Sequence, residues 1–326
     1  MTTNRRNLIS LAVGLAMACS AWGQSPANWP SKPVKFIVPA PAGTAPDIAA
    51  RLVGEKLSRI WGQSVVVDNK PGAGGLPGLI AARNAERDGY TLVLAPASAL
   101  TTTQYMYRPS QVDIAKDFTA VSLLAIGPMM MAVAANSPIN SVADLMAAAR
   151  KDPSKFSVST TWQYSVPHLT ADMLGRATGV PMHTVPFSTS GQSVSAVVNG
   201  DTQLVIDGIP PLDAMIKGGR LKAIAVFSDS RLSARPQLPT VAETYPTMVI
   251  NGWFGVVAPT GVPTAVIEKV HRDLATVLTQ PDIIERLDGF GLYPRAMSSA
   301  QFATFLEQER QRWEKALKDI GAQPLL

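Results

Sequence analysis

Short continuous apolar runs alternate along the chain with longer segments in which apolar residues recur at helical spacing. The run VKFIV at residues 34–38 has a single polar residue, which is typical of a strand buried on both faces. The next segment spaces Ile48, Leu52 and Leu57 as on one face of a helix, so we predict a helix that packs against a sheet. The chain therefore opens with a strand, a turn and a helix, the unit from which α/β proteins are built.

The turn between this strand and helix is made of small residues and includes Ala42, Gly43 and Thr44. Thr44 and Asp47 are three residues apart, which predicts a capping pair at the start of the helix. Pro46 fits in the first turn, because the N–H group that proline lacks is not needed there. An open helix N-terminus with its backbone N–H groups and dipole predicts an anion site. An ordinary strand-to-helix connection explains this stretch as well.

The same order of elements continues with a strand at residues 65–69, a glycine-rich turn at 71–75 and a helix at 76–84. The spacing of these glycines does not match a dinucleotide fingerprint, and the Lys-Ser/Thr of a P-loop is missing, so nucleotide binding is disfavoured. A third strand precedes Ser98. Ligands of open α/β sheets sit at the carboxyl ends of the strands, so we expect Thr44, Gly74 and Ser98 to face one crevice.

A long apolar stretch at residues 118–135, with a kink predicted at Gly127-Pro128, exceeds the length of a typical strand. We predict that it crosses from one lobe to another. A second α/β series follows, with strands predicted at 156–159, 183–186, 204–206 and 222–227. Hydroxyl groups and one acid collect at the ends of these strands: Thr160, Thr161, Ser165, Ser188, Thr189, Ser190 and Asp207.

The end of the chain returns to the first pattern, with a strand at 253–258 and helices at 264–278 and 298–320. We expect His271 at the surface, Trp313 in the core and Ser298 as a helix cap. The predicted organisation is lobe I from residues 24–125 and 251–326, and lobe II from residues 126–250. The cleft between two such lobes is the candidate ligand site.

Residues 1–23 combine Arg5 and Arg6, a short apolar run and a small-residue cleavage signal, so we predict an export signal and a periplasmic protein. Loose resemblances to a twin-arginine signal and to a lipoprotein cleavage site remain open. Cys19 is the only cysteine and lies inside the predicted signal, which leaves no thiol or disulfide in the mature chain. No later apolar run is long enough to span a membrane, so we expect no membrane insertion.

The mature charge and motifs exclude several functions. Loss of Arg5 and Arg6 lowers the formal charge from +5 by two, and the remaining basic residues are scattered, so nucleic-acid binding is disfavoured. The three histidines lack metal-ligand spacing, and we expect neither a metal nor a cofactor. No Gly-x-Ser-x-Gly elbow is present, so a secreted hydrolase with Ser165 and His168 is the least favoured alternative.

At this point several spaced segments carry a family resemblance: KPVKFIVPAPAGTAPDIAARL, VVVDNKPGAGG, DGYTLVLA, KDFTAVSLLAIGP, GRLKAIAVFSDSRLSARPQLPTVAE and GWFGVVAPTGVP. The chain resembles the Bug family, the extracytoplasmic solute-binding proteins of tripartite tricarboxylate transporters, over essentially its whole mature length. The resemblance implies a two-lobed type II periplasmic binding protein, in the manner of a Venus flytrap, with a hinge between two α/β lobes. It also implies a small carboxylate ligand held by backbone amides, hydroxyls and waters.

Carried over to this sequence, the resemblance places one ligand carboxylate at Gly43, Thr44 and Asp47. The usual Pro-Gly-Gly is replaced here by Ala42-Gly43-Thr44, which implies an altered pocket. In the loop that precedes His168, the family's small residues are replaced by Trp162 and Tyr164, with Ser165 beside them, and these aromatic rings favour a flat ligand.

The family's Pro-Tyr-Lys-Gly loop falls on residues 186–189, so Ser188 and Thr189 occupy it and the lysine is absent. Asp207 matches a recurrent acid that either binds an ammonium or hydroxyl group of the ligand or caps the next helix.

The resulting hypothesis is a monomer that captures a small carboxylate and delivers it to integral-membrane transporter subunits. Aliphatic di- or tricarboxylates, acidic amino acids, nicotinate-like acids and aromatic dicarboxylates all fit, with a modest preference for aromatic acids. A periplasmic sensor that feeds a two-component signalling system uses the same cleft and is the main alternative.

Overall fold

The computed structural model describes residues 29–107, 111–153 and 155–325. The export signal predicted at residues 1–23 lies outside the described residues. The strands are β1 (Val34–Val38), β2 (Val65–Asn69), β3 (Thr91–Pro96), β4 (Phe118–Ala134), β5 (Ser157–Thr160), β6 (His183–Pro186), β7 (Leu204–Gly208), β8 (Leu221–Val226), β9 (Asn251–Pro259) and β10 (Tyr293–Pro294).

The α-helices are α2 (Ala45–Trp61), α3 (Leu76–Arg83), α4 (Ala97–Thr101), α5 (Thr103–Met106), α6 (Ile114–Asp117), α7 (Val142–Lys151), α8 (Val166–Thr178), α9 (Ser190–Asn199), α10 (Ile209–Lys217), α11 (Thr264–Leu278), α12 (Pro281–Gly289) and α13 (Ser299–Asp319). Two short 3₁₀ helices, η2 (Ala73–Gly75) and η3 (Val241–Glu243), complete the described elements.

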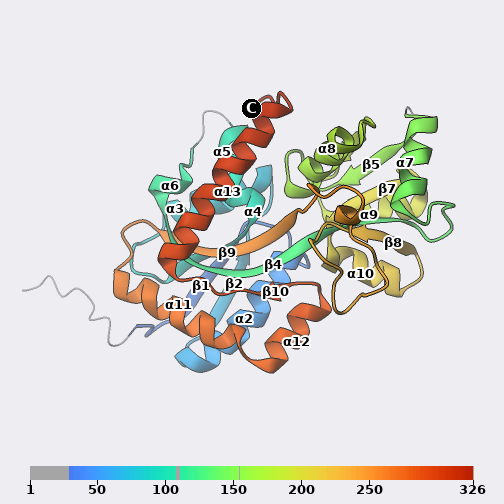
Figure 1. Cartoon of the computed structure of the whole chain (residues 1–326). Coiled ribbons are helices and arrows are strands. Elements are labelled where there is room, and N and C mark those ends of the chain that lie inside the picture. The colour runs from blue at the N-terminus through green and yellow to red at the C-terminus, as the bar shows by residue number, and fades with distance from the viewer. Residues whose placement is uncertain (1–28, 108–110, 154, 326) are drawn as a thin grey trace, which may run out of the picture.

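The strands form two sheets that share β4 (Figure 1). In the first sheet, β2, β1 and β3 are parallel, and β9 joins them to β4 through antiparallel pairing. In the second sheet, β6, β5 and β7 are parallel, and β7 and β8 pair with the later part of β4. The long apolar run is therefore one strand that belongs to both sheets.

β4 continues through Gly127-Pro128, where the sequence predicts a kink. Among the described strands, Pro128 is paired with Asn251 of β9 alone, so the N–H that proline lacks is not needed by a second neighbour. Met129, Met130 and Met131 beyond it are buried, and Met129 also lines the cavity described below. From the polar loop after β5, the sequence predicts a helix over residues 168–177, whereas α8 begins two residues earlier, at Val166. The sequence interpretation missed α12.

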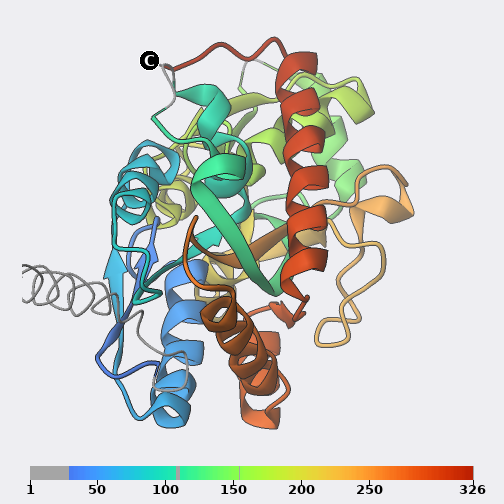
Figure 2. The ribbon, with the colours of Figure 1, turned by 90° about the vertical axis from the view of Figure 1, so that its left-hand side faces the viewer.

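The helices cover the sheets with the apolar faces that the sequence pattern predicts. Leu52, Val53 and Leu57 of α2 are buried, and α2 lies beside α11 below the first sheet (Figure 2). α13 runs along β4 on the other side of this sheet and buries Trp313, as expected. Ser298 caps α13 through a hydrogen bond from the Gln301 N–H group. After the second sheet, the chain returns to the first sheet through β9. The strand ends of the two sheets then surround one cavity, which is described below.

Candidate functional site

A cavity of about 90 Å³ lies where β4 and β9 pass between the two sheets. Elements around the first sheet contribute Ala40, Thr44, Ala45, Pro46, Pro96, Ala97, Ser98, Gly127, Pro128, Gly252, Trp253, Phe254, Gly291 and Leu292. Elements around the second sheet contribute Met129, Thr161, Trp162, Val166, Pro167, Ser190, Asp207, Gly208, Ile209, Pro210 and Pro211. Neither sheet forms this site without the other.

The electrostatic character of the cavity comes from helix starts. The first residues of α2, α8, α9 and α10 all line it. The first N–H groups of a helix have no partner within that helix, and the helix dipole adds positive potential there. The lining contains no Lys, Arg or His side chain among the described residues. The cavity therefore offers a site for an anion without a cationic side chain.

The turn before α2 differs from the predicted capping pair. Thr44 occupies the N-cap position, but its hydroxyl donates to the Pro41 carbonyl oxygen at 2.6 Å and makes no cap hydrogen bond. Asp47 instead accepts the Gly43 N–H group at 2.8 Å and pairs with Arg51. Thr44 lines the cavity at the start of α2, whereas Ala42, Gly43 and Asp47 do not line it.

The carboxyl group of Asp47 stays ionised although it is buried. Burial raises its pKa, but hydrogen bonds from Arg51 and from the Gly43 N–H group outweigh this effect, so the pKa lies below its usual range. Asp47 is only 3% exposed, and its carboxylate accepts hydrogen bonds from Gly43 in the turn and from Arg51 on α2. Asp47 thus holds the turn that presents the start of α2 to the cavity.

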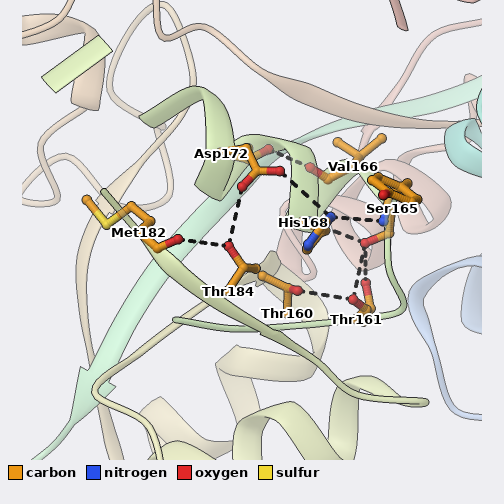
Figure 3. A network of polar contacts seen from close by, with 10 residues as sticks. Thr160, Thr161, Ser165, Val166, His168, Asp172, Met182 and Thr184 are labelled. Atoms are coloured by element: carbon orange, nitrogen blue, oxygen red, sulfur yellow. Dashed lines mark hydrogen bonds and ion pairs between the residues drawn. The ribbon is translucent and has the colours of Figure 1, made fainter. Parts of the chain in front are cut away.

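The loop before α8 is held by a buried polar network (Figure 3). Thr161 Oγ1 donates to Ser165 Oγ at 3.0 Å, and Ser165 Oγ accepts the N–H group of His168 at 3.3 Å, as a helix cap. His168 Nδ1 accepts the N–H group of Tyr164 at 2.9 Å, where Tyr164 has a left-handed φ of 62°. The network fixes the loop from the side away from the cavity. Thr161 and Trp162 of the same loop line the cavity.

The residues predicted from the sequence therefore separate into groups. Thr44, Ser98, Trp162 and Asp207 line the cavity. Gly74 and Ser188 line a neighbouring hollow that Trp162 also borders. A more open surface groove contains Thr189 together with Ser188, while Tyr164 and His168 border a different hollow beside α8, and Ser165 is buried in the network.

Asp207 is the last residue but one of β7 and has the only titratable side chain among the described residues that line the cavity. Its Oδ1 atom accepts the N–H group of Gly208 at 2.7 Å. Its Oδ2 atom is buried and has no hydrogen-bond partner among the described residues. Burial raises the pKa of this carboxyl to about 6, although the Ser190 hydroxyl and the Gly208 N–H group lower it in part.

Sequence reasoning missed the contribution of β9 and of the segment before β10. Gly252, Trp253 and Phe254 come from β9, and Gly291 comes from the turn after α12. The β9 residues reach the cavity because β9 pairs with β4, and Gly291 lies just before β10, which pairs with the same strand. Both pairings join distant parts of the chain. The glycine and tryptophan that open β9 were the available signal, since glycine in a strand often marks a close approach.

Two other kinds of function find no support in the described part of the chain. No cluster of His, Cys, Asp and Glu side chains there is arranged to hold a metal ion. Among the same residues, no helix combines the length and apolar character needed to cross a membrane.

The fold and the cavity between two sheets define the class of periplasmic binding proteins. The solved structure of Rpa4515 from Rhodopseudomonas palustris with adipate is 31% identical and covers 91% of this chain and all of its own, with a TM-score of 0.87. The structure of the periplasmic binding protein BugD is 28% identical over 91% of this chain and all of its own, with a TM-score of 0.84. MatC from the same Rhodopseudomonas, with bound malate, is 25% identical over 89% of this chain and all of its own, with a TM-score of 0.80.

The sequence comparisons agree with this class. The pattern of the TctC family, described as the tripartite tricarboxylate transporter family receptor, matches residues 49–322. Protein BugT of Bordetella pertussis is 30% identical over 97% of this chain and 98% of its own length. A protein from the tcbD-tcbE intergenic region of Pseudomonas sp. strain P51 is 31% identical over 96% of this chain and 94% of its own length. The chain belongs to the TctC/Bug family of solute-binding receptors, which is not a family of enzymes.

Proposed function

We propose that this protein captures a small carboxylate between its two lobes and delivers it to the membrane subunits of a tripartite tricarboxylate-type transporter. The observation that carries the proposal is the cavity lined by four helix starts and by no cationic side chain among the described residues. Adipate and malate, which are named in the structures of two relatives, are both dicarboxylates. Helix starts from both sheets suit a ligand with two negative ends.

The proposed mechanism is closure of two lobes around the anion. Lobe I, at residues 24–125 and 251–326, presents the start of α2. Lobe II, at residues 126–250, presents the starts of α8, α9 and α10 together with Trp162. Closure removes water from the cleft, so each hydrogen bond to the ligand becomes stronger. The closed form then presents the surface that the transporter subunits recognise.

A thermal-shift screen of the exported chain tests this proposal with adipate, malate and benzoate, read together with intrinsic tryptophan fluorescence. Ligand at roughly a hundredfold excess over its dissociation constant stabilises the folded protein by about 2.7 kcal/mol, which raises the melting temperature measurably. The fluorescence reports on Trp162 and Trp253, which line the cavity. Stronger shifts with benzoate than with adipate would support the flat-ligand preference.

The Thr44→Trp variant places a large ring at the start of α2 and is expected to abolish the shift. Thr304→Trp, at an exposed position on α13, is the matched control and keeps the shift. If no carboxylate raises the melting temperature of refolded, ligand-free protein, or if both variants respond like the wild type, the proposed site is wrong.

A further inference from the structure

Asp207 is the one acidic residue among the described residues that line a cavity otherwise suited to anions. The side chain is 7% exposed, and its Oδ1 atom is engaged by the Gly208 N–H group. The Oδ2 atom is buried and accepts no hydrogen bond of good geometry from the described residues, although the Ser190 hydroxyl is near enough to lower the pKa of the carboxyl in part. Both residues line the cavity. A buried polar atom without a partner costs free energy, so this oxygen is expected to find one when the cavity is filled.

An ionised Asp207 has no counter-charge in its surroundings. The described residues of β4, β5 and α9, which pack against β7, contain no titratable side chain. On α10, Asp213 pairs with Lys217 and Arg235. On α8, His168 faces Asp172, and these two groups, like Arg176, border a different hollow. Across the cavity, the lining residues of the first sheet contain no titratable side chain among those described.

Burial already raises the pKa of Asp207 to about 6 in the unliganded protein. A carboxylate ligand in the same cavity places a second negative charge near Oδ2. Like charges at short distance disfavour the ionised form and raise the pKa further. The proton therefore becomes more strongly held at the moment when an anion enters.

We propose that Asp207 binds the ligand in its protonated form and donates a hydrogen bond from Oδ2 to a ligand carboxylate. This inference rests on the proposed carboxylate function. Ligand capture then takes up one proton from solvent, and release of the ligand returns it. The shared proton lets two carboxyl groups meet where two carboxylates would repel each other, as in paired-carboxyl sites.

The orientation of the side chain makes Asp207→Asn an informative variant. The Gly208 N–H group requires an acceptor at the Oδ1 position, so the amide oxygen takes that place and the NH₂ group takes the place of Oδ2. The variant thus imitates the protonated acid at every pH. Asp207→Ala removes the donor and also the acceptor of the Gly208 N–H group, so a loss of binding in this variant alone does not identify the donor.

Isothermal titration calorimetry with adipate and malate tests the proposal between about pH 6.5 and about pH 8.5, where simple carboxylates are ionised. Each titration is repeated in two buffers with different ionisation enthalpies, which counts the protons taken up. Near about pH 8.5, we expect the wild type to take up close to one proton for each ligand bound. Its affinity should there fall by up to about tenfold for each further pH unit. Asp207→Asn is expected to bind with no such dependence, and Asp207→Ala to bind weakly throughout.

Adipate or malate binding by the wild type without proton uptake and with constant affinity would overturn the role of Asp207 and leave the carboxylate function standing. Binding of ethanolamine in preference to the acids, lost in Asp207→Asn, would also overturn it, because Asp207 would then accept a hydrogen bond as an ionised group. Absence of binding by any acid would overturn both proposals. The buffer comparison on the wild type decides the question even if a variant fails to fold.

Discussion

At the residue scale, His168 decides the conformation of the loop that carries Trp162. Its Nδ1 atom accepts the Tyr164 N–H group, which requires Nδ1 to be unprotonated. Burial lowers the pKa of His168, and Asp172 only partly opposes this effect. The folded state thus favours the neutral form of the His168 ring. Its contribution to stability is full above the ordinary pKa of about 6.5 and is lost as the pH falls toward the lower pKa of the folded state.

We predict that His168→Gln lowers the free energy of unfolding at about pH 7.5 by roughly 1–3 kcal/mol, because the buried Tyr164 N–H group loses its acceptor. The difference between wild type and variant should shrink as the pH falls to about 5.5, since below about 6.5 His168 of the unfolded chain takes up a proton that the buried ring disfavours. Urea unfolding at the two pH values measures this. His183→Asn, at an exposed position, is the control and should show no such change. A wild-type advantage that is equal at both pH values would contradict the role of the neutral ring.

At the element scale, one carboxylate joins α13 to β9. Glu309 Oε2 accepts the indole N–H groups of Trp253 at 2.8 Å and Trp313 at 3.1 Å, and all three residues are buried. Trp253 also lines the cavity. The long C-terminal helix thus supports a wall of the ligand site from behind.

Replacement of this carboxylate tests the attachment of α13. We predict that Glu309→Leu lowers the free energy of unfolding by about 3 kcal/mol, because two buried N–H donors lose their acceptor. Glu309→Gln keeps a neutral acceptor and should cost roughly 1 kcal/mol. The exposed ion pair of Glu307 and Arg310 is the comparison, and Glu307→Gln should cost less than about 1 kcal/mol. Urea unfolding followed by tryptophan fluorescence measures all three, and equal losses for both Glu309 variants would refute this account.

Elements with strong periodicity were predictable from the sequence, and long-range pairings were not. The apolar pattern predicts β1 and α11 with the boundaries that the structure has. The predicted cap by Thr44 was wrong, because its hydroxyl donates to the Pro41 carbonyl oxygen and makes no hydrogen bond with the helix N–H groups. The spacing of residues does not show which of these partners the hydroxyl takes. Four residues of the cavity lining could be predicted because they follow or end strands: Thr44, Ser98, Trp162 and Asp207. The contribution of Trp253 depends on the pairing of β9 with β4, which no local pattern contains.

At the scale of the whole molecule, the approach of the two halves depends on Gly291. This residue has a φ of 67°, and a Cβ atom there would lie 2.3 Å from Ile209 Cδ1 at the start of α10. Gly62 has a similar φ of 62°, with no atom within 4 Å of the same position. The two glycines therefore share the backbone requirement and differ only in the contact across the cavity.

We predict that Gly62→Ala costs about 1 kcal/mol of stability, the strain of a left-handed residue, and leaves adipate binding unchanged. Gly291→Ala should cost a further 1–3 kcal/mol or so and weaken binding, because Ile209 and the start of α10 must move away. Urea unfolding and calorimetric titration separate the two effects. Equal stability losses and equal affinities in the two variants would show that the contact with Ile209 does not matter.

The pairing of Pro128 with Asn251 places the beginning and the end of an intervening segment side by side. Everything between them, from Met129 to Ile250, leaves the first sheet and returns to it through neighbouring positions of β4 and β9. The two ends of this segment therefore lie next to each other. We expect that exchange of residues 129–250 between relatives that share these two strands replaces the cavity lining from the second sheet and keeps the lining from the first.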